Sequence, residues 1–202
     1  MKKTGILGGT FDPVHLGHLG LAGDAMEQVG LDEIILIPAK LQPFKLDKKI
    51  TPGKDRLAML RLATEDFPDF KVSDYEMTQE GVSYTYLTMR AMQQQEGPDA
   101  HLYFITGTDT FLKIETWKEA TELLSSYSFI VGTRPGYRRE ELETCIERIC
   151  CVYNTVVRNI DNVQLDISST DIRKRLETGT SAEDLIPRKV ERYIIDHGLY
   201  RE

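Results

Sequence analysis

Two histidines near the N-terminus have a spacing that suits phosphate chemistry. His15 and His18 follow the glycine pair Gly8-Gly9, and residues three apart share one face of a helix. Glycine has no Cβ, so the backbone can approach a bulky ligand closely. The start of a helix also offers free N–H groups and the positive end of its dipole to a phosphate. The segment therefore predicts a site that stabilises negative charge on a phosphoryl group during its transfer.

A structural turn or part of a zinc site would account for the same residues. A glycine pair after a strand is often only a turn, and this spacing is not the GxGxxG dinucleotide fingerprint. A zinc site needs more ligands than two histidines. No cysteine and no further histidine lies between His18 and His101, and Asp12 is the only candidate nearby. On the residues alone, a phosphate site and a structural turn remain open alternatives.

The elements that must position this segment alternate between strand and helix. Apolar runs typical of buried strands occur at residues 4–7, 34–37, 102–105 and 129–131, and we also expect strands at 72–77 and 163–167. Helices are expected from near His15 to Gly30, from about Asp55, after Ser83, over 117–124 and 140–150, after 167–170, and from Pro187 to Gly198. This order predicts an α/β fold with an open, mostly parallel, Rossmann-like (doubly wound) sheet and helices on both faces. Ligands bind such sheets at the carboxyl ends of the strands.

Two of these helices carry specific burial predictions. In the helix from Asp55, the residues expected on the buried side are Leu57, Leu60, Leu62 and Ala63. In the helix that follows, Ser83 is expected to be the cap, with Leu87 and Ala91 facing the core.

Composition indicates a single globular domain that does not bind along nucleic acids. The chain has 202 residues, 41% of them hydrophobic, which suits one domain spanning residues 1–202. The net charge of -7 argues against binding along nucleic-acid backbones. The three cysteines, Cys145, Cys150 and Cys151, lack metal spacing and suit reduced thiols. No apolar run has transmembrane length, so we expect a soluble cytoplasmic protein.

Two motifs resemble the signatures of the nucleotidylyltransferase superfamily. Gly9-Thr10-Phe11-Asp12-Pro13 followed by His15-Leu16-Gly17-His18 resembles the H-x-G-H motif of that superfamily, and Ile167–Arg173 resembles its second motif, I-S-S-T-x-I-R. By themselves, Ser168 and its neighbours would be an ordinary serine-rich helix cap with a solvated arginine. The resemblance instead implies that this segment holds the phosphates of ATP, with Ser169 and Arg173 in contact.

Further segments resemble the bacterial nicotinate-nucleotide adenylyltransferases. These are Gly81–Tyr86 (G-x-S-Y-T-Y), Thr106–Asp109 (a G-x-D loop), the tryptophan Trp117, Thr133–Gly136 (an R-P-G turn) and the ending Leu185–Tyr200. In that family a loop reading P-x-H-K carries a lysine that meets the phosphates. Lys45 matches that lysine, but Phe44 stands where histidine is usual. Leu87 also departs from the aspartate that is frequent after Y-T-Y.

The resemblance implies adenylyl transfer from ATP to nicotinate mononucleotide by direct attack, giving deamido-NAD and pyrophosphate, with Mg²⁺ bound to ATP. The implied catalytic residues are His15, His18, Lys45 and Arg173. The implied ATP-binding residues are Gly8, Gly9, Thr10, Phe11, His15, His18, Gly107, Asp109, Ile167, Ser168, Ser169 and Arg173. The implied nicotinate-nucleotide-binding residues are Lys45, Thr85, Tyr86, Trp117 and Arg134. No residue is assigned to a protein-held metal.

Alternative functions remain open at this stage. Nicotinamide mononucleotide or phosphopantetheine would be the acceptor in related transferases, and a regulator that binds nucleotide without catalysis would share both motifs. We expect small-molecule partners, ATP and nicotinate mononucleotide, and neither nucleic acid nor membrane. The sequence leaves open whether the chain forms a homodimer.

Overall fold

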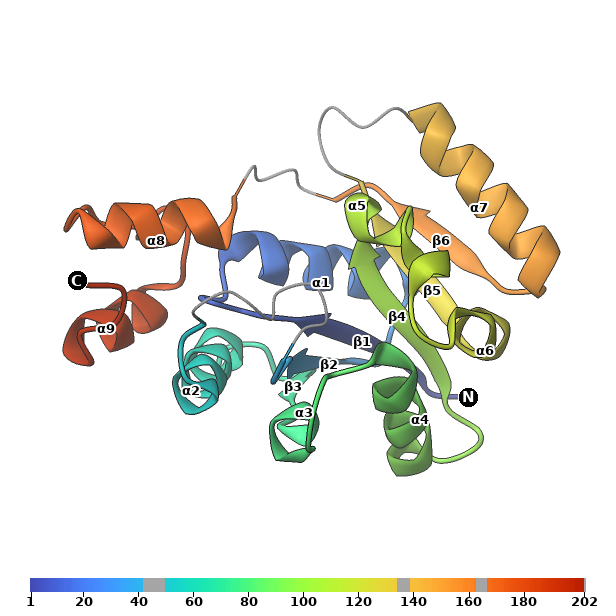
Figure 1. The fold of residues 1–202 in the computed structure, drawn as a ribbon, viewed down its shortest axis with the longest axis horizontal. Helices are drawn as coiled ribbons and strands as arrows, with labels where there is room; N and C mark the ends of the chain where they lie inside the picture. The colour runs from blue at the N-terminus through green and yellow to red at the C-terminus, as the bar shows by residue number, and fades with distance from the viewer. Residues whose placement is uncertain (42–49, 134–138, 163–166, 202) are drawn as a thin grey trace.

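A parallel sheet forms the centre of the molecule in the computed structural model, which describes residues 1–41, 50–133, 139–162 and 167–201 (Figure 1). Its six strands run in the order β3-β2-β1-β4-β5-β6, and every neighbouring pair is parallel. The strands are β1 (Lys3–Gly9), β2 (Glu33–Pro38), β3 (Phe70–Val72), β4 (His101–Gly107), β5 (Ser128–Gly132) and β6 (Val157–Ile160). The predicted open, parallel, doubly wound sheet is confirmed.

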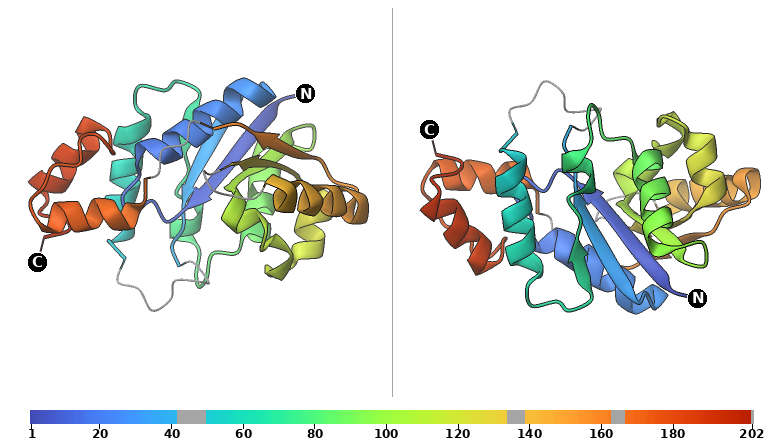
Figure 2. Two further views of the ribbon diagram at one scale, coloured as in Figure 1. Left: turned by 90° about the horizontal axis from the view of Figure 1, so that it is seen from above. Right: turned by 90° about the horizontal axis from the view of Figure 1, so that it is seen from below.

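Helices cover both faces of this sheet (Figure 2). One face carries α1 (Leu16–Val29) and α2 (Gly53–Thr64), and α8 (Ser169–Glu177) and α9 (Arg188–Asp196) extend the same core cluster beyond the sheet (Figure 1). The other carries α4 (Thr85–Glu96), α5 (Thr108–Phe111), the 3₁₀ turn η1 (Ile114–Thr116), α6 (Ala120–Ser126) and α7 (Arg139–Tyr153), and a short helix, α3 (Tyr75–Thr78), precedes α4. Along β2, Ile34 and Leu36 pack into the first layer, while Ile35 and Ile37 pack into the second. This alternation explains why the strand is apolar at consecutive positions.

The order of the strands reverses at β1. The chain proceeds from β1 to β2 and β3 on one side, then returns to β4 on the other side of β1. A crevice therefore opens between the carboxyl ends of β1 and β4, which is where open α/β sheets bind their ligands. The segment Gly8–His18 lies at that end of β1, and Gly107 ends β4.

The strand predicted at residues 72–77 is wrong. β3 ends at Val72, and residues 75–78 form α3. The main-chain N–H of Ser73 makes a last bond to Leu36 O at 3.0 Å, and the Ser73 hydroxyl then accepts the N–H of Tyr75 at 3.3 Å. The chain turns at Ser73, where this local bond from the side chain to the backbone replaces the next bond of the sheet.

Four of the five residues predicted as a strand at 163–167 lie outside the described part of the chain, and the fifth, Ile167, belongs to no strand. The last strand in the described residues is β6, whose central residues Arg158 and Asn159 are exposed and polar. An edge strand with polar exposed positions carries little apolar signal, so the sequence pattern missed it.

The cap predicted for α4 is wrong, and so is the burial predicted for Leu87. The N-cap is Tyr84, and the Ser83 hydroxyl instead accepts the main-chain N–H of Lys40 at 3.2 Å. Leu87 is 40% exposed, because the buried face of the helix consists of Thr88, Met89 and Met92. Ala91 is half-buried and packs against the same core layer.

Two other helices start or face differently from the prediction. The segment expected as a helix over 117–124 is split: Trp117 ends η1, Glu119 takes a left-handed conformation (φ 54°), and α6 begins at Ala120. In α2, Leu60 and Ala63 are buried as expected, while Leu57 and Leu62 are only half-buried. Their places in the core are taken by Met59 and by two charged residues, Asp55 and Arg56.

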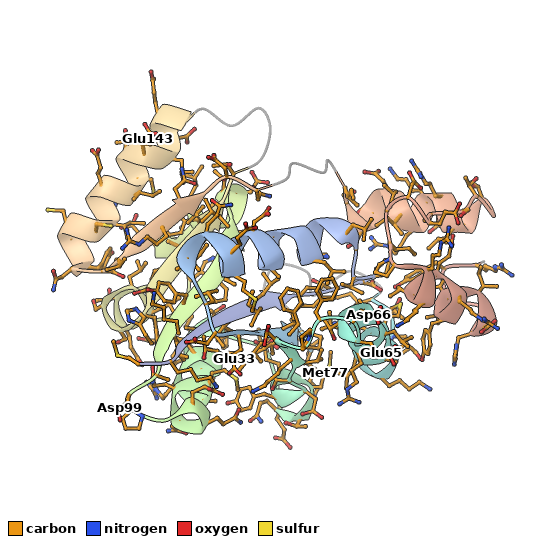
Figure 3. The ribbon with its side chains drawn as sticks, turned by 180° about the vertical axis from the view of Figure 1, so that it is seen from behind. Glu33, Glu65, Asp66, Met77, Asp99 and Glu143 are labelled. Atoms are coloured by element: carbon orange, nitrogen blue, oxygen red, sulfur yellow. The ribbon has the colours of Figure 1, made fainter. Side chains whose placement is uncertain are left out.

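The C-terminal helix α9 packs against α2. Lys189 on α9 lies 3.0 Å from both Glu65 and Asp66, the two acids that follow α2 and are labelled in Figure 3. The hydroxyl of Tyr193 donates to the buried carboxylate of Asp55 at 2.9 Å. In the described residues, no helix is long and apolar enough to cross a membrane.

Candidate active site

The first motif forms the floor of a cavity of about 740 Å³ at the crevice. Gly8, Gly9 and Thr10 line it where β1 ends. A Cβ built on Gly9 would come within 3.0 Å of the Phe11 ring, so only glycine leaves room for that ring. Phe11 itself is 1% exposed, has a left-handed φ of 49°, and packs behind the cavity instead of lining it.

The two histidines form a stacked pair at the start of α1. Their ring centroids lie 3.6 Å apart at 24°, and the edge of Phe11 meets the His18 ring at 4.9 Å. The main-chain N–H of His15 donates to Nδ1 of His18 at 3.2 Å. Since Nδ1 is the acceptor of this bond, the neutral His18 ring carries its proton on Nε2. This arrangement can offer an N–H donor to a phosphate oxygen in the cavity.

Gly17 makes room for the pair. A Cβ at this position would come within 3.1 Å of His15 Nδ1 and 3.8 Å of the Ile167 side chain. The glycine inside the H-x-G-H motif therefore leaves room for the His15 ring at the first turn of α1.

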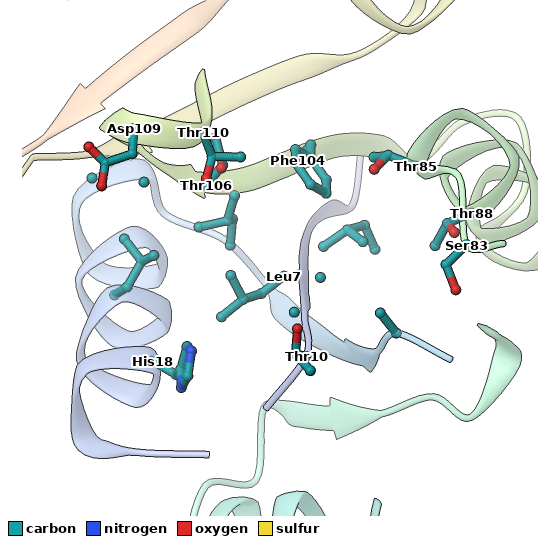
Figure 4. A pocket seen from close by; sticks show the side chains of 18 of the residues that line it. Leu7, Thr10, His18, Ser83, Thr85, Thr88, Phe104, Thr106, Asp109 and Thr110 are labelled. Carbon is teal, nitrogen blue, oxygen red and sulfur yellow. The ribbon is translucent and has the colours of Figure 1, made fainter. Parts of the chain in front are cut away.

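The cavity extends from α1 across the sheet to α4. In Figure 4, His18 and Asp109 lie on one side of Leu7 and Thr10, and Ser83 and Thr88 lie on the other. At the first side, Gly107 ends β4 and Asp109 lies in α5 directly after it. This length suits an elongated ligand with two ends of different chemistry.

Aromatic groups mark the α4 end. Trp117 lines the cavity and meets the Phe104 ring edge-on, with centroids 5.9 Å apart. Tyr84 also lines it, and Lys118 Nζ lies 4.6 Å from the Tyr84 ring centroid. Flat rings with a nearby cation suit an aromatic ligand that carries negative charge. Trp117 is thus a half-buried cavity residue, in agreement with the prediction that it lines a pocket.

The second motif is fastened to the first through main-chain oxygens. Arg173 Nη1 donates to Asp12 O at 2.6 Å, and the Ser169 hydroxyl donates to Pro13 O at 3.0 Å. Ser168 caps α8 by accepting the N–H of Asp171 at 3.1 Å. These contacts bring the two motifs together although their residues are more than 150 positions apart in sequence.

Asp12 connects four parts of the chain. Its carboxylate is 4% exposed, accepts the Tyr200 hydroxyl at 2.6 Å and the main-chain N–H of Thr51 at 3.3 Å, and lies 3.9 Å from Arg173. Burial and the nearby Asp12 carboxylate both raise the pKa of Tyr200, so this hydroxyl remains protonated and donates.

Arg56 supports the same loop from beneath. This side chain is 2% exposed and donates to three main-chain oxygens: Thr10 O at 2.7 Å, Ala39 O at 2.8 Å and Thr51 O at 2.9 Å. Burial lowers the pKa of the Arg56 guanidinium, while the Asp12 carboxylate acts in the opposite direction. Sequence reasoning missed this residue, although a charged side chain on the buried face of α2 was a usable signal.

Many of the predicted site residues line the cavity: Gly8, Gly9, Thr10, His15, His18, Thr85, Gly107, Asp109, Trp117 and Ile167. Others among the described residues do not line it: Phe11, Tyr86, Ser168, Ser169 and Arg173. Tyr86 instead packs against the core layer that contains α4 to α7, with the Arg90 guanidinium 5.8 Å from its ring centroid. Lys45 and Arg134 lie outside the described residues. Cavity residues that the sequence did not single out include Glu76, Thr88 and Asn162.

Comparison with known proteins gives consistent matches over the whole chain. Residues 6–175 match the cytidylyltransferase-like family. A probable nicotinate-nucleotide adenylyltransferase of Thermoanaerobacter sp. (strain X514) is 41% identical over 99% of this chain and 95% of the relative. Another, of Clostridium botulinum (strain Eklund 17B / Type B), is 40% identical over the full length of both chains.

Solved structures share the fold. A Plasmodium falciparum nicotinic acid mononucleotide adenylyltransferase complexed with NaAD superposes with a TM-score of 0.81 at 22% identity, covering 99% of this chain and 98% of that one. A putative nicotinate-nucleotide adenylyltransferase from Vibrio parahaemolyticus gives 0.70 at 22% identity, covering 100% and 97%.

Proposed function

Because the chain belongs to the cytidylyltransferase-like family and, within it, to the nicotinate-nucleotide adenylyltransferases, we infer that its cavity binds ATP and nicotinate mononucleotide together. The protein transfers the adenylyl group of ATP to nicotinate mononucleotide in NAD biosynthesis, giving nicotinate adenine dinucleotide and pyrophosphate. The observation that carries the assignment of the two substrates is the long cavity, with a histidine pair at one end and Trp117 at the other.

We propose that ATP occupies the half bounded by β1, α1 and the end of β4. There His18 Nε2 donates to the α-phosphate as the bond from the nicotinate nucleotide forms, and His15 holds the ring of His18 in place. Gly107 and Asp109 bind the adenosine ribose. Lys45 and Arg173 neutralise the β- and γ-phosphates, and Ser169 fastens the start of α8, the helix that carries Arg173, to Pro13.

The reaction in this proposal is a direct in-line displacement. The 5′-phosphate oxygen of nicotinate mononucleotide forms a bond to the α-phosphorus of ATP, and the bond from that phosphorus to the oxygen of the β-phosphate breaks. Pyrophosphate leaves with the electron pair, and no serine or cysteine nucleophile takes part. The enzyme contributes position and charge stabilisation.

Enzymes of this kind generally use a divalent metal together with ATP. No group of three or more His, Cys, Asp or Glu side chains within the described ranges is placed to hold a metal. Mg²⁺ is typically bound through substrate phosphates with few protein ligands. The residues therefore fit a Mg²⁺ that enters with ATP and neutralises charge on its phosphates, and we propose Mg²⁺ as that metal.

We propose that the acceptor's pyridine ring stacks on Trp117, with Thr85 and Tyr86 supplying main-chain amides and Arg134 a further contact. We also propose that residues 1–202 form one domain. The protein acts in the cytoplasm on small molecules and binds neither nucleic acid nor a membrane. Analytical ultracentrifugation would distinguish a monomer from a homodimer.

The test measures pyrophosphate release with Mg-ATP and one of three acceptors. Nicotinate mononucleotide is expected to react much faster than nicotinamide mononucleotide or phosphopantetheine. Preference for nicotinamide mononucleotide would overturn the acid specificity, and preference for phosphopantetheine would overturn the acceptor class. Absence of release with all three would favour a regulator that binds nucleotide.

A further inference from the structure

The cavity wall beside α4 contains a buried carboxyl group that the proposed roles leave unused. Glu76 lies on α3, is 8% exposed and lines the cavity together with Ser83 and Thr88. Figure 4 shows Ser83, Thr85 and Thr88 grouped at this end, away from His18. Carboxylates are rarely buried without a partner, so the contacts of Glu76 indicate what it does.

Glu76 joins three consecutive segments of the wall. The Thr88 hydroxyl donates to Glu76 Oε1 at 2.6 Å, and Ser83 is close enough to this carboxyl group to lower its pKa. Burial raises the pKa of Glu76, and Thr88 and Ser83 act in the opposite direction. The ion pairs between described residues do not include Glu76. The carboxyl group is therefore held by hydroxyl donors.

These contacts fix the first turn of α4. Tyr84 is the N-cap and makes no side-chain bond to the helix, and Thr85 is the first helical residue. The opening N–H groups of a helix lack intrahelical partners and favour an anion. Tyr84, Thr85 and Thr88 all line the cavity, so this turn faces the ligand. Its orientation depends on Thr88, which Glu76 holds from α3.

We propose that Glu76 is a positioning residue for the acceptor: through Thr88 and Ser83 it orients the first turn of α4 so that its amides receive the carboxylate of nicotinate mononucleotide. This inference rests on the proposed function. It makes Glu76 a determinant of the choice between the acid and the amide of the pyridine, because only the acid carries the negative charge that the helix start favours. Glu76 acts through α4 and does not contact the reacting phosphorus.

The experiment compares Glu76→Ala, Glu76→Gln and the matched control Glu80→Ala, an exposed acid in the same segment. Steady-state kinetics are measured with nicotinate mononucleotide, nicotinamide mononucleotide and ATP. Glu76→Ala is expected to raise KM for nicotinate mononucleotide about tenfold, the cost of one or two hydrogen bonds. The KM for ATP and the kcat are expected to change less than about threefold, and the acid-to-amide preference to shrink by about the same tenfold factor.

Glu76→Gln retains a carbonyl oxygen that accepts the Thr88 hydroxyl, so it is expected to recover most of the acceptor affinity, and Glu80→Ala to resemble wild type. A fall in kcat with an equal rise in both KM values would overturn the inference, because it would mark general damage to the fold. An unchanged KM for nicotinate mononucleotide in Glu76→Ala would also overturn it.

Thr88→Val covers the case in which Glu76→Ala does not fold. It removes the donor while keeping the shape of the side chain, and a rise in the acceptor KM alone would support the inference. An unchanged acceptor KM in Thr88→Val would overturn it. Wild-type enzyme inactive with nicotinate mononucleotide would refute the proposed function itself, whereas an active wild type with unaffected variants refutes only the role of Glu76.

Discussion

The hydroxyl of Tyr200, near the C-terminus, donates a hydrogen bond of 2.6 Å to Oδ1 of Asp12 in the first motif. The two residues are 188 positions apart. The main-chain oxygen of Asp12 accepts from Arg173 of the second motif. The end of the chain therefore supports the loop that joins both motifs, and Tyr200 should influence ATP binding without entering the cavity.

Tyr200→Phe tests this connection. The substitution removes one donor from a buried carboxylate, which typically costs about 1–3 kcal/mol of stability. Because the Asp12 loop also holds Arg173, the KM for ATP is expected to rise about threefold to tenfold. Urea unfolding and ATP titration of the rate measure the two effects.

Tyr193→Phe is the matched control. Tyr193 makes the same kind of bond, to Asp55 at 2.9 Å, but fastens α9 to α2 and does not touch the first motif. It should lose a similar free energy of unfolding with an unchanged KM for ATP. If both variants raise the KM for ATP by the same factor, the effect of Tyr200→Phe comes from global destabilisation and not from the loop that carries Asp12.

Arg173→Ala is expected to lower kcat/KM for ATP about tenfold to a hundredfold, since a charge-assisted bond to phosphate contributes about 1.5–3 kcal/mol. Arg173→Lys should recover little, because a lysine cannot reproduce the planar guanidinium. Arg175→Ala, on the same helix and paired with the exposed Asp184, is the control and should behave as wild type. Normal ATP kinetics in Arg173→Ala would remove this arginine from the phosphate site.

The sequence predicted the parts of the fold whose signal is local. The apolar runs at 34–37 and 102–105 became β2 and β4, because strands buried on both faces need apolar residues at successive positions. The polar edge strand β6 has no such run. β3 ends at Val72, and the Ser73 hydroxyl bonds to the main-chain N–H of Tyr75 at the turn that follows, which a count of apolar residues does not register.

The candidate site was predictable where glycine and histidine spacing fixes a local turn. His15 and His18 stack as neighbours on one turn, as their spacing suggests. The contacts of Arg56 with Thr10 and of Tyr200 with Asp12 join distant segments, and no local pattern encodes such a meeting. Glu76 was also missed, because one acid in a polar segment normally lies in solvent.

His18→Ala is expected to lower kcat at least about a hundredfold, with a modest change in ATP binding, because the lost donor acts mainly on charge that develops in the transition state. Single-turnover rates and ATP affinity by calorimetry separate the two effects. His197→Ala removes a ring that stacks on Tyr193 outside the cavity, and it should leave kcat unchanged. Wild-type turnover in His18→Ala would exclude this histidine from the mechanism.

His101 gives the stability of the fold a dependence on pH. It begins β4, at the opposite end of that strand from the cavity, with Nε2 2.8 Å from the Ser128 hydroxyl and its ring stacked on Tyr103. Burial lowers the pKa of His101, and Lys3 lowers it further. The unfolded chain, with a histidine pKa of about 6.5, therefore binds more protons than the folded chain just below that pH.

Stability should accordingly be full above about pH 6.5 and fall as the pH drops through the lowered pKa of the folded state. His101→Gln should remove the contribution of His101 to this pH dependence of the free energy of unfolding. The difference in that free energy between wild type and variant should therefore shrink as the pH is lowered from about 7.5 to 5. Urea unfolding of both proteins at several pH values measures this difference. Parallel curves for the two proteins would show that His101 does not titrate differently on folding. The KM values at pH 7.5 should stay unchanged, because the side chain is at the end of β4 away from the ligands.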